Sequence, residues 1–123
     1  MAILWFDEKN KGLIATIATA NITLNKTAKN LIEYAYSVML GINKEEHKAY
    51  IKALNKETVE RGNIPQTQLY TVTLRQSYGR ISNKEYIKRI SELTGKDYTS
   101  PVKYIMTYDY DEHMLIIDLN REV

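Results

Sequence analysis

A chain of 123 residues is the size of one domain and is long enough to bury a modest core. Its 44% apolar and 26% charged residues argue against disorder, and its lack of cysteine excludes a disulfide scaffold, a thiolate metal site and a cysteine nucleophile. The net charge of +2 is too small to indicate nucleic acid by itself. The N-terminal "MAILWFDEKNKG" lacks the basic start of a signal peptide, and no apolar window approaches a membrane span, so we expect a cytoplasmic protein without a membrane partner.

The first half of the chain predicts a hairpin, a long helix and a strand. "AILWF" and "LIATIA" are apolar runs separated by the turn "DEKNKG". A helix is then predicted from Asn25, as N-cap, to Gly41, as the C-terminal stop. It is predicted because apolar residues recur there at helical spacing: Ala28, Leu31, Ile32, Ala35, Val38 and Met39. The alternating "HKAYIKALN" predicts a strand.

The second half predicts a connector, a strand, a helix and a hairpin. "NKETVERGNIPQTQ" is the most polar stretch and is typical of a connector with one helical turn, whereas "LYTVTL" is typical of a strand. In "SNKEYIKRISELTG" Ser82 and Glu85 have the spacing of a capping box and Gly95 is placed to end the helix. The alternating "VKYIMTYDYDEHMLIIDLN" predicts a hairpin.

These elements predict an α+β fold of one domain, residues 1–123, with two helices packed on about six to eight mostly antiparallel strands. The halves 1–55 and 69–123, joined by the polar connector 56–68, also resemble each other. "LNKTAKNLIE" aligns with "SNKEYIKRIS", and "EEHKAYIKALN" with "DEHMLIIDLNR". Two interpretations stay open: an internal duplication with pseudo-two-fold symmetry, or unrelated strand-helix-hairpin units with similar turn chemistry.

The stretch "RQSYGRISNKEYIK" carries the leading functional hypothesis, a basic patch with an interleaved aromatic residue. Such patches contact nucleic-acid backbones. We expect Arg and Lys to contact phosphates, Gln and Asn to lie nearer to bases, and Tyr to stack or to form hydrogen bonds. The candidate DNA-binding residues are Arg75, Gln76, Tyr78, Arg80, Asn83, Lys84 and Lys88. The alternative is an ordinary solvated helix face.

No pattern indicates catalysis. The chain has no G-x-S-x-G elbow, no P-loop and no G-x-G-x-x-G, so we expect neither an enzyme nor a cofactor. His47 and His113 each lie in an acidic turn. The densest cluster with the chemistry of metal ligands is Asp109, Asp111, Glu112 and His113. Because neighbouring turn residues point in divergent directions, we favour solvated turns and expect no metal.

The competing function is a non-catalytic protein-interaction module. The chain has ten tyrosines against one phenylalanine and one tryptophan, and tyrosine is favoured both in half-buried sheets and at interfaces. Tyr98, Tyr104, Tyr108 and Tyr110 gather near the last hairpin. A surface built from them would bind a protein partner or form a homodimer.

Two resemblances add expectations. "ITLNKTAKNLIEYAYSVMLGI…KAYIKAL" resembles the strand, basic helix, Leu-Gly-Ile and hairpin order of AbrB-like swapped-hairpin DNA-binding domains, over about half of the chain. "YGRIS" is similar to the Gly-Arg-Val/Ile step of that family, so the resemblance implies DNA binding and transcription regulation. With its "LIIDLN" end, the whole chain also resembles small uncharacterised proteins of prophages and mobile elements in low-GC Gram-positive bacteria.

Overall fold

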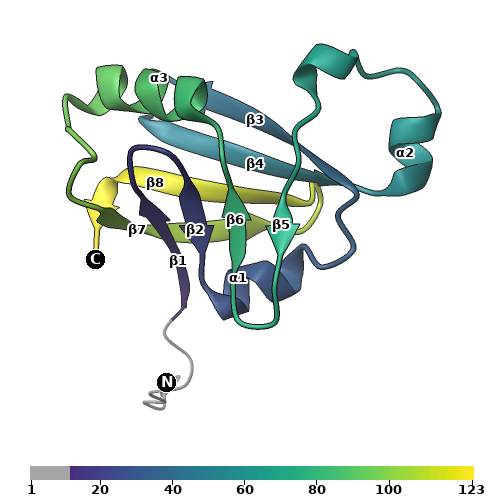
Figure 1. Ribbon diagram of the computed structural model, residues 1–123, viewed down its shortest axis with the longest axis horizontal. Coiled ribbons are helices and arrows are strands. Elements are labelled where there is room, and N and C mark those ends of the chain that lie inside the picture. The colour runs from purple at the N-terminus through teal and green to yellow at the C-terminus, as the bar shows by residue number, and fades with distance from the viewer. Residues whose placement is uncertain (1–11) are drawn as a thin grey trace, which may run out of the picture.

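One strongly curled antiparallel sheet dominates the computed structural model, which describes residues 12–123 (Figure 1). The described strands are β1 Leu13–Ile17, β2 Ile22–Leu24, β3 Ser37–Asn43, β4 Lys48–Leu54, β5 Thr73–Leu74, β6 Gly79–Ile81, β7 Val102–Asp109 and β8 Met114–Glu122. They lie in the order β3-β4-β8-β7-β1-β2-β6-β5. The predicted strand "AILWF" lies outside the described residues.

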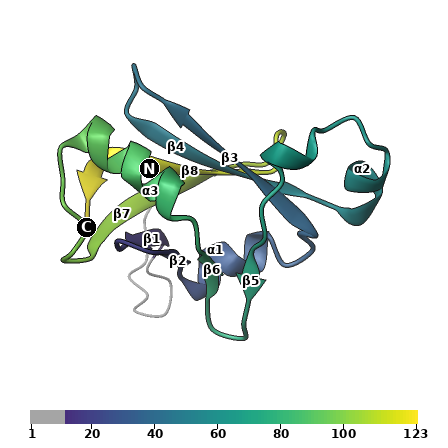
Figure 2. The same ribbon diagram turned by 45° about the horizontal axis from the view of Figure 1, so that its top comes forward.

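The α+β class is confirmed, but the fold is dominated by its strands rather than built of helices packed on strands. Three α-helices are described instead of the two predicted: α1 Lys26–Leu31, α2 Lys56–Glu60 and α3 Lys84–Thr94. Helices α1 and α3 lie at opposite ends of the curled sheet, and α2 lies apart on the connector with the short 3-10 turn Gln66–Gln68 (Figures 1 and 2).

The long first helix was predicted wrongly. Asn25 does cap α1, with its side-chain oxygen accepting a hydrogen bond from the Ala28 amide at 3.1 Å, but the helix ends at Leu31. Residues Ser37–Asn43 form β3, and Gly41 lies inside that strand, not at a helix end. A seven-residue ladder with β4 satisfies this backbone, and the β-branched and aromatic residues around Val38 favour it.

The start of the second helix also differs from the prediction. Asn83, not Ser82, is the N-cap of α3, and its side-chain oxygen accepts a hydrogen bond from the Tyr86 amide at 3.0 Å. The Ser82–Glu85 capping box is therefore wrong by one residue. Gly95 ends the helix in the left-handed conformation as predicted, with φ 73°. Tyr86, Ile87 and Ile90 are buried against the sheet.

The hairpin β7–β8 is confirmed and supplies much of the core. Its buried residues are Tyr104, Met106, Leu115, Ile117 and Leu119. Tyr110, which the alternation places on the same face, is 71% exposed because it lies beyond the end of β7. The fully buried Tyr104 hydroxyl lies 2.8 Å from that of Tyr98, so the two phenols satisfy each other inside the core.

The element order repeats across the connector. β1-β2-α1-β3-β4 is followed, after residues 55–68, by β5-β6-α3-β7-β8. Within the sheet β4 lies beside β8, and β2 beside β6, so strands at equivalent places in the two halves are neighbours (Figure 2). An internal duplication would produce this arrangement. Whether the two halves arose by duplication stays a hypothesis.

Candidate nucleic-acid interface

The hairpin β5–β6 brings four of the seven predicted residues together. Arg75, Gln76, Tyr78 and Arg80 lie on its turn and on β6, and the turn is closed by the Arg75 amide, which donates to the Tyr78 carbonyl at 2.8 Å. The guanidinium carbon of Arg80 lies 5.6 Å from the centre of the Tyr78 ring, within the range of a cation–π contact. This contact orients one arginine on the outer face of the sheet.

The other three predicted residues lie beyond the opposite end of β6. β6 ends at Ile81, and Lys84 and Lys88 lie on α3, outside the strand that carries Arg80. The side-chain oxygen of Asn83 is occupied by its capping bond. Lys84 and Lys88 line a shallow depression that also contains Asp97. The predicted patch is thus divided into a hairpin group and a helix group, and a carboxylate lies near the second.

Carboxylates are absent from half of the sheet. No Asp or Glu occurs in residues 12–32 or 61–84, so β1, β2, β5 and β6 carry none. The first carboxylates after these segments, Glu33 and Glu85, form ion pairs with Lys29 and Arg89. Within residues 12–123, Arg75 and Arg80 form no ion pair. Among residues 12–123, the cations of this half of the sheet therefore have no carboxylate on their own strands to offset their charge.

A row of outward-facing side chains crosses this half of the sheet and continues onto the neighbouring strand β7. The strand register places Lys103 opposite Thr16, Thr16 opposite Thr23, Thr23 opposite Arg80, and Arg80 opposite Thr73. Thr16 lies between two fully buried residues of β1, so its side chain points away from the core. The sequence analysis missed this row, because its members come from five segments and only the strand order joins them.

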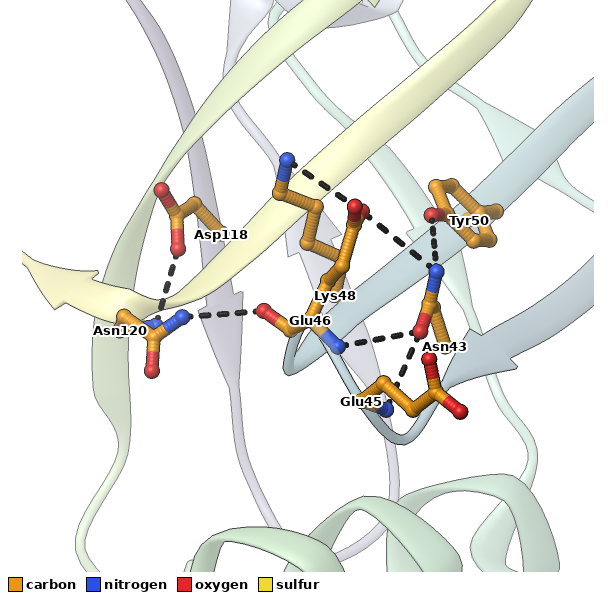
Figure 3. A network of polar contacts seen from close by, with 7 residues as sticks. All are labelled: Asn43, Glu45, Glu46, Lys48, Tyr50, Asp118 and Asn120. Carbon is orange, nitrogen blue, oxygen red and sulfur yellow. Dashed lines mark hydrogen bonds and ion pairs between the residues drawn. The ribbon is translucent and has the colours of Figure 1, made fainter.

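The acidic turns fold as hairpin ends. In the β3–β4 turn the Asn43 side-chain oxygen accepts from the amides of Glu45 and Glu46, at 3.1 and 3.0 Å, and Lys48 lies 3.7 Å from Glu46 (Figure 3). The β7–β8 turn repeats this pattern with Asp109 as the acceptor. In the part of the chain that the structure describes, no group of three potential metal ligands converges.

The exposed tyrosine surface differs from the predicted one. Tyr98 and Tyr104 are buried in the core and cannot contribute. Tyr110 packs edge-to-face on Tyr108 at 4.8 Å. Burial, followed by a hydrogen bond with Tyr34, raises the pKa of Tyr108 to about 12. Tyr34, Tyr108 and Tyr110 thus form a tyrosine surface at the end of β7.

A groove of about 290 Å³ lies between β3 and the start of α3. Leu40, Ile42 and Tyr70 form apolar walls, and the Tyr86 hydroxyl donates to the Gly41 carbonyl at 2.8 Å on its floor. The groove lining contains no serine, threonine or histidine, so its described side chains do not pair a nucleophile with a base. Burial raises the pKa of Tyr86, which keeps its phenol protonated.

None of the helices described in residues 12–123 is long and apolar enough to cross a membrane.

Comparison with known proteins places no further constraint on the site. The chain matches no protein-family model, no curated protein and no solved structure. The resemblance to AbrB-like domains therefore stays a hypothesis, and the function has to be argued from the chemistry of the surface.

Proposed function

We propose that this protein is a small DNA-binding regulatory protein that contacts phosphates through the β5–β6 hairpin. The observation that carries the proposal is the half-sheet without carboxylates, from which Arg75 and Arg80 project beside Tyr78. Cations without nearby carboxylates keep their full attraction for a polyanion. A DNA partner is also what the AbrB-like resemblance implies, and it fits a cytoplasmic, non-enzymatic protein.

The residues divide into stronger and weaker contacts. Arg75 is exposed at the turn, and Arg80 is held by the Tyr78 ring, so both guanidinium groups can donate to phosphate oxygens. Gln76 is exposed at the same turn and can donate to a phosphate or a base edge. Lys84 and Lys88 form a second, weaker contact because Asp97 lines the same depression.

The test measures binding of a fluorescent 20-base-pair duplex by anisotropy over a series of salt concentrations. Each phosphate contact contributes about 0.9 to the slope of log K against log salt. The double variant R75A/R80A should therefore lower the slope by about 1.8 and weaken binding at every salt concentration.

The matched control is Arg61→Ala. Arg61 lies on the connector just after α2, outside the β5–β6 hairpin; its side chain is 63% exposed and pairs with Glu57 at 2.7 Å. Its loss changes the net charge by one without touching the proposed site. A salt slope for R75A/R80A no lower than that for Arg61→Ala, or no binding of wild type even at low salt, would refute the proposal.

A second function, a protein-interaction module, is favoured by one observation. Tyr34 and Tyr110 are 48% and 71% exposed and surround Tyr108, and such rings bind partners at low entropic cost. If this surface forms a homodimer, the protein should sediment as a dimer, and the Y34S/Y110S variant as a monomer. If the wild type sediments as a monomer, the homodimer is excluded and the partner of this surface has to be a different protein.

A further inference from the structure

We infer that the nucleic acid bound by this protein is a duplex, held across the outer face of the half-sheet by Arg80 on β6 and by Lys103 on β7. The inference rests on the proposed function and extends it to a residue outside the hairpin. The row Lys103–Thr16–Thr23–Arg80–Thr73 carries it, because cross-strand pairing places these side chains in one line on one face.

The spacing of the two cations suits a duplex. Arg80 and Lys103 are separated by three strand-to-strand steps, which places their Cα atoms about 14 Å apart. The major groove of B-DNA is about 12 Å wide. Two side chains at this separation can reach phosphates on the two sides of one groove. A single strand offers no second backbone at a fixed distance.

The chemistry of the row also favours a duplex. Between the two cations stand the hydroxyls of Thr16 and Thr23, which can form hydrogen bonds with base edges in the groove. Binding of single strands relies on aromatic rings on which successive bases stack. In β1, β2, β5 and β6 as described there is no aromatic residue, and the neighbouring Tyr78 already packs on Arg80.

The shape of the sheet is compatible with a duplex that lies across the row. The sheet curls around the core, and β1, β2, β6 and β5 cross in front of β7 and β8 in Figure 1, so their outer face is convex. A convex β surface can enter the major groove, which accommodates a two-stranded ribbon. Strands β1 and β2, which lie between the two cations, would then face the groove, with Arg80 and Lys103 meeting its two backbones.

The experiment compares a 20-base-pair duplex with one of its single strands, using wild type, K103A, R80A and K52A. Lys52 is the matched control, because it is a strand lysine on β4, outside the row, and pairs with Glu112 at 2.9 Å. We expect tighter binding of the duplex, and a loss of about 0.9 from the salt slope in K103A but not in K52A. Over a fourfold rise in salt, K103A should then lose affinity about 3.5-fold less than wild type.

The outcomes separate the two proposals. If R80A weakens binding and K103A behaves as K52A, the inference about Lys103 is overturned while the proposed function stands. If the single strand binds as tightly as the duplex, the duplex assignment is overturned. If no variant changes binding, both proposals fail. Circular dichroism melting of each variant shows whether it is folded, and Lys103→Gln replaces Lys103→Ala if the alanine variant melts early.

Discussion

The cap of α3 gives a direct test of how this structure is held together. Asn83→Ala removes the side-chain oxygen that accepts from the Tyr86 amide at 3.0 Å and leaves that donor without a partner in the first helical turn. Loss of an N-cap costs about 1 kcal/mol. α3 buries Tyr86, Ile87 and Ile90 in the core, so the helix cannot fray without exposing apolar surface, and we expect this cost to appear in global unfolding.

The assay is urea denaturation followed by circular dichroism. Asn83→Ala should lower the free energy of unfolding by about 1 kcal/mol and the melting temperature by about 4 °C. Asn83→Ser should retain most of the stability, since serine caps almost as well as asparagine. Ser82→Ala, at an exposed position, should change stability by less than about 0.5 kcal/mol. A larger loss from Ser82→Ala than from Asn83→Ala would refute the cap assignment and restore the capping box.

Three further predictions concern the tyrosines and one turn. Tyr104→Phe should cost about 1–2 kcal/mol, because the buried Tyr98 hydroxyl loses a partner, and adding Tyr98→Phe should cost less than the sum in a double-mutant cycle. Burial raises the pKa of Tyr86, Tyr104 and Tyr108 above 10, so the unfolded chain releases these protons first. The contribution of these three phenols to the free energy of unfolding should therefore be constant well below pH 10 and fall as the pH rises from 10 to 12; a flat profile over that range contradicts this. His47 has φ 56°, so His47→Gly should raise stability by about 0.5–1 kcal/mol; a loss would show that the side chain matters more than the backbone.

Local sequence determined those elements that depend only on interactions between residues a few positions apart. Asn25 and Gly95 carry helix ends because an amide oxygen and a flexible backbone act on their immediate neighbours. The alternation from Val102 onward determined β7 and β8, because a strand with one buried face needs a period of two. The same reasoning found β4.

Only the tertiary structure decided the state of Ser37–Asn43. Val38 and Met39 satisfy the helical spacing that begins at Ala28, so the local pattern allows either structure. Residues 37–43 form a hydrogen-bonded ladder with β4, and Val38 is fully buried. These tertiary interactions stabilise the strand more than the local interactions of a short helix would stabilise a helix.

The candidate site depended on tertiary structure in the same way. Sequence proximity placed Arg75 and Arg80 together correctly, because one hairpin holds both. It could not show that Arg80 lies on β6 whereas Lys84 lies on α3, because the boundary between strand and helix depends on the pairing of β6 with β2. Nor could sequence proximity show that Lys103 lies in the same row as Arg80. Their alignment depends on the strand order β7-β1-β2-β6, and that order is decided by packing between distant segments.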